Sequence, residues 1–454
     1  MERNITDIFV SYLHGLNCTS LPDAAFEQAR LCLLDFEGVA IAGNRILEEQ
    51  GSAFLAFVRK QGGTVSIVGR QEKTTMQNAA FLNAMAAHIT ELDDGHRKGQ
   101  IHLGASIISA LLPVAEVEGL SLEDVLRGIV VGYEAAVRLA MAMNPAHKLR
   151  GYHTSGTCGA IGVAVAVASA MKASRDVLKD VVSAATASAS GLLELQEDRS
   201  ELKPYNLAHA TVGGITAAYC GMAGFRGPED AIGGRRGLLA VLSDDPHTRY
   251  LTEFDEPCCQ IERIYRKPYA ACRHAHSAIE AALVLREKAG LSPTDIQRIR
   301  IETYGMAIAG HDHKSVTGVQ SANMSIPFSV ALSLVSGSAG LDDYSEATVR
   351  DEEILRLADK VCIVEDHEIS SWLPERRAAR VTIFAQGQSF VQLVEYPKGE
   401  PENPMSYNEV LNKFIDCSLY AGLNVASIHR VVSSITENIS GSISDLLSHL
   451  IPYL

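Results

Sequence analysis

The first half of the chain carries a helical pattern. From residue 5 to about 240, apolar side chains recur mostly at three- and four-residue spacing, and Ala is frequent where helices must approach closely. One helix has Pro22 near its start and Gly43 as a plausible stop, and Ser121 is a candidate N-cap of another, with acids in its first turn. Similar patterns predict helices over 76–90, 156–172, 175–194 and 210–224.

The pattern changes after about residue 260. A helix over 277–290 is followed by alternating segments, typical of strands, at 296–305, 360–366 and 378–396, the last of which predicts a hairpin at "QGQ". The Pro/Gly/acid segment 397–404 reads as a linker, and amphipathic helices return at 406–423 and 443–454.

These segments predict a mainly α fold with two domains. We expect a large all-helical domain formed by residues 1–264 and completed by 403–454, with a smaller α+β domain, 265–402, inserted between the two parts.

Composition narrows the class of protein. Hydrophobic residues make up 47% of the 454 positions, enough for a large core, and the net charge of −14 without a Lys/Arg cluster argues against nucleic-acid binding. The longest apolar stretches fall short of the roughly 20 residues that span a bilayer. The N-terminal "MERNITDIFVSYL" lacks the pattern of a secretory signal, and the nine scattered cysteines suit a reducing compartment, so we expect a cytoplasmic protein.

Four polar clusters interrupt the apolar pattern. Each holds residue types that can bind an anion or transfer a proton: Asp93, Asp94, His96 and His102 in "ELDDGHRKGQIHLGA"; His153 in "GYHTSGTCGA"; Lys203, Tyr205 and His209 in "SELKPYNLAHA"; and Lys267, Tyr269, Arg273, His274 and His276 in "RKPYAACRHAHSA". Taken singly, each histidine is more often a helix cap or loop residue, and each lysine more often a surface charge. A helix starting after His153 would offer its backbone N–H groups to an anion.

Cofactor sites have little support in the sequence. Two Asp and two His within ten residues can ligate a divalent ion, but the spacing from His96 to His102 matches no HExxH helix. The chain has no GxGxxG after a strand, no GxxxxGK[ST] loop and no GxSxG elbow. We therefore expect neither a metal nor a nucleotide cofactor.

In their order along the chain, the clusters resemble the motifs of the MmgE/PrpD family. The matching segments are "AFLNAMAAHITELDDGH", "HLGASIISALLPVAE", "GYHTSGTCGAIGVAVAVA", "LKPYNLAHATVGGITAAYCGMAGFRGPEDAIGGRRGLL", "KPYAACRHAHSAIEAAL", "NMSIPFSVALSLVSG" and "YPKGEPENPMSYNEVLNKF". The resemblance runs along nearly the whole chain.

The resemblance implies both an activity and a set of site residues. It implies a cofactor-independent homodimer that acts on a small di- or tricarboxylate, with His102, His153, Lys203 and Lys267 at catalytic positions. It further implies substrate binding by Asp93, Asp94, Tyr269, Arg273 and His276. Fixed cations would stabilise the negative charge that develops when a proton leaves the carbon next to a carboxylate, and histidine can transfer that proton near neutral pH.

The chain departs from the family pattern at four positions, with Glu91, Gly95, Leu103 and Phe328 in place of the expected aspartate, threonine, proline and tyrosine. Three hypotheses stay open. The first is a dehydratase of the 2-methylcitrate dehydratase type. The second is an epimerase or decarboxylase of the iminodisuccinate epimerase or cis-aconitate decarboxylase type. The third is a non-catalytic carboxylate-binding or purely structural relative.

Overall fold

A computed structural model describes residues 4–19, 21–196, 200–254, 258–437 and 441–452. The chain divides into two compact units. The first contains the residues up to Gln196, Ser200–Ile264 and the residues from Ser406 onward, and the second contains Tyr265–Met405. The fold is mainly α with a small α+β region, as the sequence predicts.

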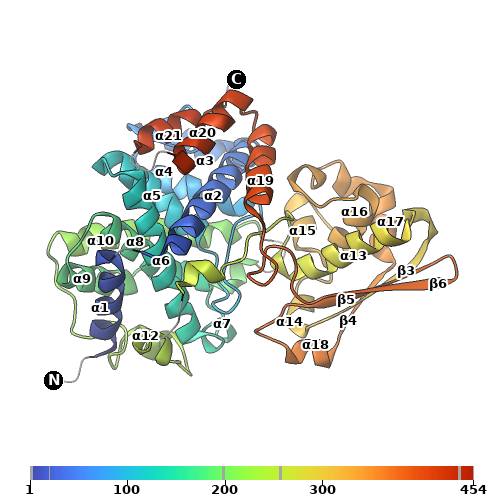
Figure 1. The fold of residues 1–454 in the computed structure, drawn as a ribbon, viewed down its shortest axis with the longest axis horizontal. Helices are drawn as coiled ribbons and strands as arrows, with labels where there is room; N and C mark the ends of the chain where they lie inside the picture. The colour runs from blue at the N-terminus through green and yellow to red at the C-terminus, as the bar shows by residue number, and fades with distance from the viewer. Residues whose placement is uncertain (1–3, 20, 197–199, 255–257, 438–440, 453–454) are drawn as a thin grey trace. The chain divides into compact units, whose positions relative to one another are not determined.

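The first unit is built almost entirely from helices (Figure 1). They are α1 (Ile5–Cys18), α2 (Asp23–Gln50), α3 (Ser52–Gln61), α4 (Met76–Ile89), α5 (Gly104–Glu118), α6 (Leu122–Met143), α7 (Ala146–Leu149), α8 (Thr154–Ala170), α9 (Arg175–Thr186), α10 (Lys203–Met222), α11 (Leu238–Leu242), α12 (Arg249–Thr252), α19 (Tyr407–Tyr420), α20 (Val425–Glu437) and α21 (Ile443–His449), with a two-stranded sheet of β1 (Val65–Ser66) and β2 (Lys73–Thr74).

Helix α8 is the centre of this unit, because every residue from Thr154 to Ala170 is buried. It packs against α6 and α10 through small residues. A Cβ at Gly132 of α6 would lie 2.6 Å from Ala166 Cβ and 2.9 Å from Gly162 O. The backbones of α6 and α8 therefore approach too closely for larger side chains.

The prediction that Gly43 ends a helix is wrong, because α2 continues to Gln50. A Cβ at Gly43 would lie 1.8 Å from the carbonyl oxygen of Ala86 in α4. Gly43 lets two helices cross in contact, and periodicity within one segment does not distinguish that role from a helix stop.

Other helix boundaries also differ from the prediction. Ser121 does cap α6, with a capping box to Asp124. Helix α9 ends at Thr186, eight residues before the predicted end at 194, and the segment beyond it includes Gly191 with φ 149, a conformation that favours glycine. Helix α10 begins at Lys203, seven residues before the predicted start at 210, with Pro204 in its first turn.

The second unit is a four-stranded sheet with helices. Its elements are α13 (His276–Ala289), β3 (Ile296–Thr303), α14 (Gly305–Ile308), α15 (Val319–Met324), α16 (Ile326–Ser336), α17 (Glu352–Asp359), β4 (Val361–Glu365), α18 (His367–Ser371), β5 (Ala379–Ala385) and β6 (Gln388–Val394). The strand order is β4-β3-β5-β6, with β3 and β4 parallel and the other pairs antiparallel.

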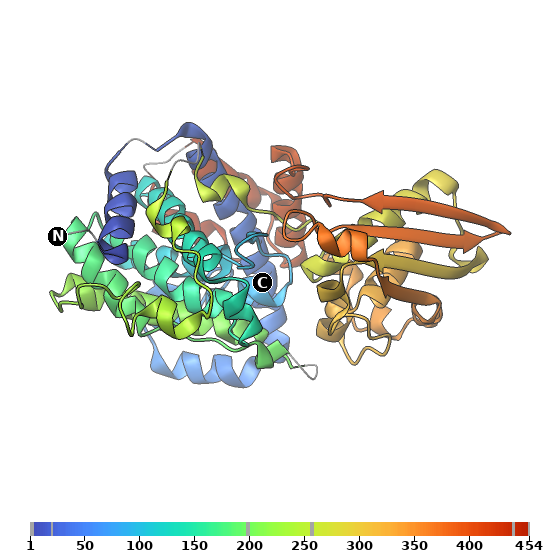
Figure 2. The same ribbon diagram turned by 90° about the horizontal axis from the view of Figure 1, so that it is seen from below.

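The predicted hairpin is confirmed. β5 and β6 are joined by Gln386 and Gly387, both with positive φ, which matches the twist of a two-residue hairpin turn. The two strands run side by side in Figure 2. Helix α13 packs on β5 and β6, and α16 packs on α13.

The linker 397–404 hydrogen-bonds to the second unit. Arg266 N–H donates to Gly399 O at 3.0 Å, and Lys398 N–H donates to Glu280 Oε2 at 2.6 Å. The division between the units accordingly falls after Met405, three residues beyond the predicted boundary. No helix in the described part of the chain is both long and apolar enough to cross a bilayer.

Candidate active site

A chain of hydrogen bonds joins two histidines through one carboxylate in the first unit. His88, at the end of α4, places Nδ1 2.8 Å from Asp93 Oδ2, and His102 Nδ1 lies 3.0 Å from the same oxygen. The two imidazole rings meet edge to face with centroids 4.8 Å apart. We call His88, Asp93, His102 and the neighbouring His153 the histidine cluster.

Asp93 is the anion of this cluster. Burial by itself would raise the pKa of Asp93, but His102 and His88 outweigh it and hold that pKa well below its usual range. His102 Nδ1 also lies 3.1 Å from the carbonyl oxygen of Asp94. Because both neighbours of this nitrogen are acceptors, Nδ1 carries the hydrogen and Nε2 is the nitrogen that can exchange a proton with another group.

His153 lies directly before α8 and is buried. The backbone N–H of His102 donates to Ser155 Oγ in the first turn of α8 at 3.0 Å, which brings the two histidine segments together. Burial lowers the pKa of His153 well below the usual value, and His88, Lys203 and His102 lower it further. The ring is therefore neutral at pH 7, and its Nδ1 has no hydrogen-bond partner among the described residues.

Lys203 starts α10 and forms an ion pair with Glu91, at the position where the family pattern has aspartate. Side-chain exposures of 12% and 10% show that both groups are largely withdrawn from water. The structure thus gives Glu91 a specific partner, Lys203, which the family resemblance places at a catalytic position.

Asp94 has structural partners. Its Oδ1 accepts from Gly104 N–H at 2.8 Å and its Oδ2 accepts from Tyr133 Oη–H at 2.6 Å, so it caps the N-terminus of α5. Burial raises its pKa. The substrate-binding role predicted for Asp94 stays a prediction. The residue directly before α5 is Leu103, which is buried.

The remaining predicted residues belong to the second unit. Arg273 donates to Glu400 Oε1 from Nε at 3.1 Å and from Nη2 at 2.8 Å, and its Nη1 lies 2.9 Å from His276 Nδ1. Tyr269 packs its ring 5.2 Å from His276, and Lys267 is 1% exposed. Arg273 thus contacts Glu400 and His276, and the roles predicted for Lys267, Tyr269, Arg273 and His276 stay predictions. The departure Phe328 is a core residue in the same unit.

Sequence reasoning missed His88 and Tyr133. His88 is a single imidazole in an Ala-rich helix, and Tyr133 lies inside the apolar pattern of α6. The only signal was a polar side chain on an otherwise apolar, buried helix face. That signal is shared by many ordinary core residues.

His88, Asp93 and His102 also form a group with the residue types of a metal site. One possible ligand atom from each lies within 4.8 Å of the others. Such N and O donors suit zinc and other divalent ions. In this structure the Nδ1 atoms of His88 and His102 both contact Asp93 Oδ2, while His88 Nε2 is buried without a hydrogen-bond partner among the described residues.

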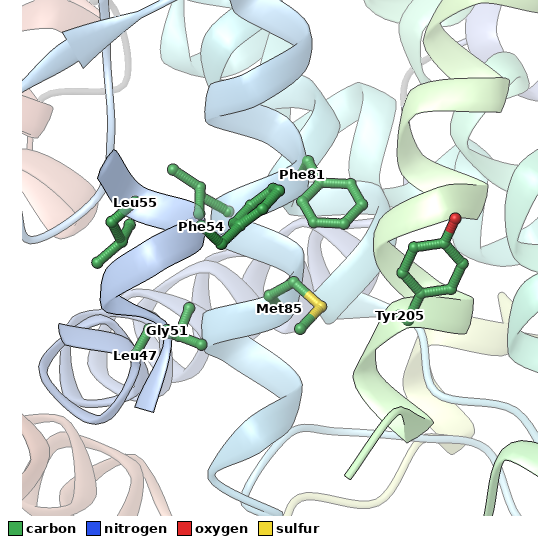
Figure 3. A pocket seen from close by; sticks show the side chains of 8 residues that line it. Leu47, Gly51, Phe54, Leu55, Phe81, Met85 and Tyr205 are labelled. Carbon is green, nitrogen blue, oxygen red and sulfur yellow. The ribbon is translucent and has the colours of Figure 1, made fainter. Parts of the chain in front are cut away.

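An apolar pocket of about 230 Å³ lies elsewhere in the first unit, between α2, α3, α4 and α10. Figure 3 shows Phe81 between Phe54 and Tyr205, with Met85 nearby, and the ring centroids of these aromatic neighbours are 5.4 and 6.0 Å apart. This pocket has no charged lining residue, so it is unsuited to binding a polycarboxylate.

Comparison with known proteins gives matches along most of the chain. Residues 7–251 match the MmgE/PrpD N-terminal domain, and residues 269–430 match the MmgE/PrpD C-terminal domain. A cis-aconitate decarboxylase-like protein of Aspergillus oryzae is 24% identical over 474 residues, covering 98% of this chain and 97% of the relative. The cis-aconitate decarboxylase of Mus musculus is 21% identical, and the match covers 91% of this chain and 86% of the relative. The mitochondrial 2-methylcitrate dehydratase of Yarrowia lipolytica is 23% identical, and the match covers 81% of this chain and 73% of the relative.

Proposed function

Because this chain belongs to the MmgE/PrpD family, we propose that it is a lyase that removes a proton next to a carboxylate of a small di- or tricarboxylate. The reaction we place first is loss of water from a hydroxy-polycarboxylate of the 2-methylcitrate type. The relatives named as dehydratases support this choice.

The observation that carries the proposal is the neutral, buried His153 beside a second imidazole that contacts an ionised carboxylate. A neutral imidazole can accept a proton at pH 7, so we assign His153 as the base. Asp93 stabilises a protonated His102, so we assign His102 as the acid that protonates the leaving hydroxyl. A neutral His153 and a His102 paired with the Asp93 carboxylate would supply the base and the acid that such catalysis requires.

Lys203 is our choice for the carboxylate-binding cation of the first unit. Its ammonium is nearly buried, where an ionic interaction is stronger than at an exposed site. A substrate carboxylate would compete with Glu91 for it. We propose that the substrate is also bound by Lys267, Tyr269, Arg273 and His276. Mutation of each residue tests this role.

An assay in deuterated solvent tests the proposal. Candidate di- and tricarboxylates are incubated with the protein while water loss, CO₂ release, inversion and deuterium incorporation are followed separately. We expect water loss from at least one hydroxy acid, reduced about 10²–10⁴-fold by His153→Gln. Normal turnover in His153→Gln would refute the assignment of the base. If a ligand stabilises the wild-type protein but no turnover is detected, a binding protein would be favoured.

Decarboxylation is the second candidate, since the relatives named for cis-aconitate decarboxylation cover 98% and 91% of this chain. Loss of CO₂ leaves a related carbanion, which the same cation would stabilise and an imidazolium would protonate. Release of CO₂ without water loss would select this candidate, and inversion alone would select an epimerase.

A further inference from the structure

A second set of reactive side chains lies in the second unit and has no part in the proposed mechanism. It consists of Cys272, His274, Tyr304 and His311, which we call the thiol–imidazole cluster. Cys272 Sγ lies 3.3 Å from His311 Nε2, and the rings of His274 and His311 have centroids 5.1 Å apart. His274 Nδ1 lies 2.7 Å from Tyr304 Oη.

The position of the hydrogen on His311 follows from its other contact. Nδ1 lies 2.7 Å from the carbonyl oxygen of Ala309, which can only accept a hydrogen bond. Nδ1 therefore carries the hydrogen of the neutral ring, and Nε2 presents its lone pair to the thiol of Cys272. A nucleophile, a base and a group that orients the base are thus aligned.

The neighbouring pair holds the second ring in place. Burial raises the pKa of Tyr304, so its phenol keeps its proton, and a hydrogen bond joins its Oη to His274 Nδ1. The rings of His274 and His311 meet edge to face, and this contact limits how the ring of His311 can turn. The base facing Cys272 is therefore fixed from two sides.

Two other cysteines, Cys18 and Cys158, differ from this arrangement in their contacts and burial. Cys18 lies 3.5 and 3.7 Å from both ring nitrogens of His14, a side-on contact at an exposed helix end without a single directed lone pair. Cys158 is fully buried, and burial raises the pKa of its thiol to about 12. Cys272 is 8% exposed and His311 is partly exposed, whereas Cys158 is fully buried.

We propose that Cys272 is a site of oxidation by small peroxides, with His311 as its base. His311 Nε2 takes the thiol proton, and the thiolate attacks one oxygen of hydrogen peroxide. The S–O bond forms as the O–O bond breaks, and the leaving hydroxide takes the proton from His311 and departs as water. The product is a sulfenic acid, with sulfur oxidised and peroxide reduced.

The test is peptide mass spectrometry on the full chain, treated with dilute hydrogen peroxide and a sulfenic-acid trap such as dimedone. We expect Cys272 to be labelled at least about tenfold faster than the exposed Cys18 and Cys362. His311→Asn should slow labelling of Cys272 about tenfold or more, while the matched variant His14→Asn leaves labelling of Cys18 unchanged.

The readout does not depend on catalysis, so it separates this proposal from the proposed function. Equal labelling of Cys272 and Cys18 in the wild-type protein would overturn the proposal that Cys272 is an oxidation site. That comparison uses no variant, so it does not depend on whether a variant folds. Unchanged labelling of Cys272 in a folded His311→Asn protein would overturn the role of the base.

Discussion

At His153 the protein holds an imidazole neutral in its interior, and this has a consequence for stability. Its pKa is lowered in the folded state, so between that pKa and 6.5 the unfolded chain binds a proton that the folded chain does not. Stability therefore rises with pH up to about 6.5 and then levels off. Below 6.5 the expected loss from this group is about 1.4 kcal/mol per pH unit.

Urea unfolding of the wild type and His153→Gln at pH 5.5 and 7.5 measures this effect. The variant should lose less stability between the two pH values than the wild type. Its loss should not vanish, because burial also lowers the pKa of His147. Equal pH dependence in both proteins would show that His153 is not held neutral.

The ion pair between Lys203 and Glu91 gives a second prediction at this scale. If Lys203 binds a substrate carboxylate in ground and transition states alike, Lys203→Ala should chiefly raise KM, by about tenfold to a hundredfold. Lys267→Ala should act in the same way if its predicted role is correct. Steady-state kinetics measure both, with the exposed Lys60→Ala as the control.

Glu91→Gln probes the same pair from the other side. It removes the internal competitor for the ammonium of Lys203, so KM should fall or stay constant rather than rise. A rise in KM equal to that of Lys203→Ala would indicate that Glu91 positions the lysine rather than competing with the substrate.

Among the helices, the crossing of α2 and α4 is a sensitive point. Gly43→Ala would place a methyl group 1.8 Å from Ala86 O, so the helices must separate, at a cost of about 1–3 kcal/mol or more. Gly15, inside α1, has no atom within 4 Å of a built Cβ, and Gly15→Ala should stabilise the protein by about 0.5–1 kcal/mol. Chemical unfolding of the two variants should give changes of opposite sign.

The elements themselves were largely predictable because each has a local cause. Ser121 caps α6 through its own side chain, and the two-residue turn at Gln386 and Gly387 follows from backbone preferences within the hairpin. The errors arose where the cause is distant. Gly43 was interpreted as a stop because its partner, Ala86, lies in another helix.

For the molecule as a whole, the sequence indicates which segments hold the polar side chains of the candidate site, but not how these side chains pair. His102, His153 and Lys203 were expected at the site, and the structure links His102 to the start of α8 and Lys203 to Glu91. The sequence does not single out His88, which contacts Asp93, nor does it show that Asp94 accepts a hydrogen bond from the N-terminus of α5. Pairing depends on the tertiary fold, which residue types and spacing alone do not specify.

A long-range contact supports the site from the far end of the chain. Lys413 of α19 lies 2.7 Å from Asp35 Oδ1 and 2.7 Å from the carbonyl oxygen of Leu92, the residue before Asp93. Lys413→Met would leave the carboxylate of Asp35 buried without its cation, which should cost about 3–5 kcal/mol. Calorimetry should show recovery when Asp35→Leu is added, and no recovery would mean that the ion pair is not the cause.

The same contact bears on the order in which the protein is made. Helix α19 follows Tyr265–Met405 in the chain, so a ribosome completes the whole second unit before it synthesises Lys413. Until then Asp35 and the carbonyl of Leu92 lack this partner. The nascent polypeptide should therefore form this support of the histidine cluster only after α19 emerges from the exit tunnel.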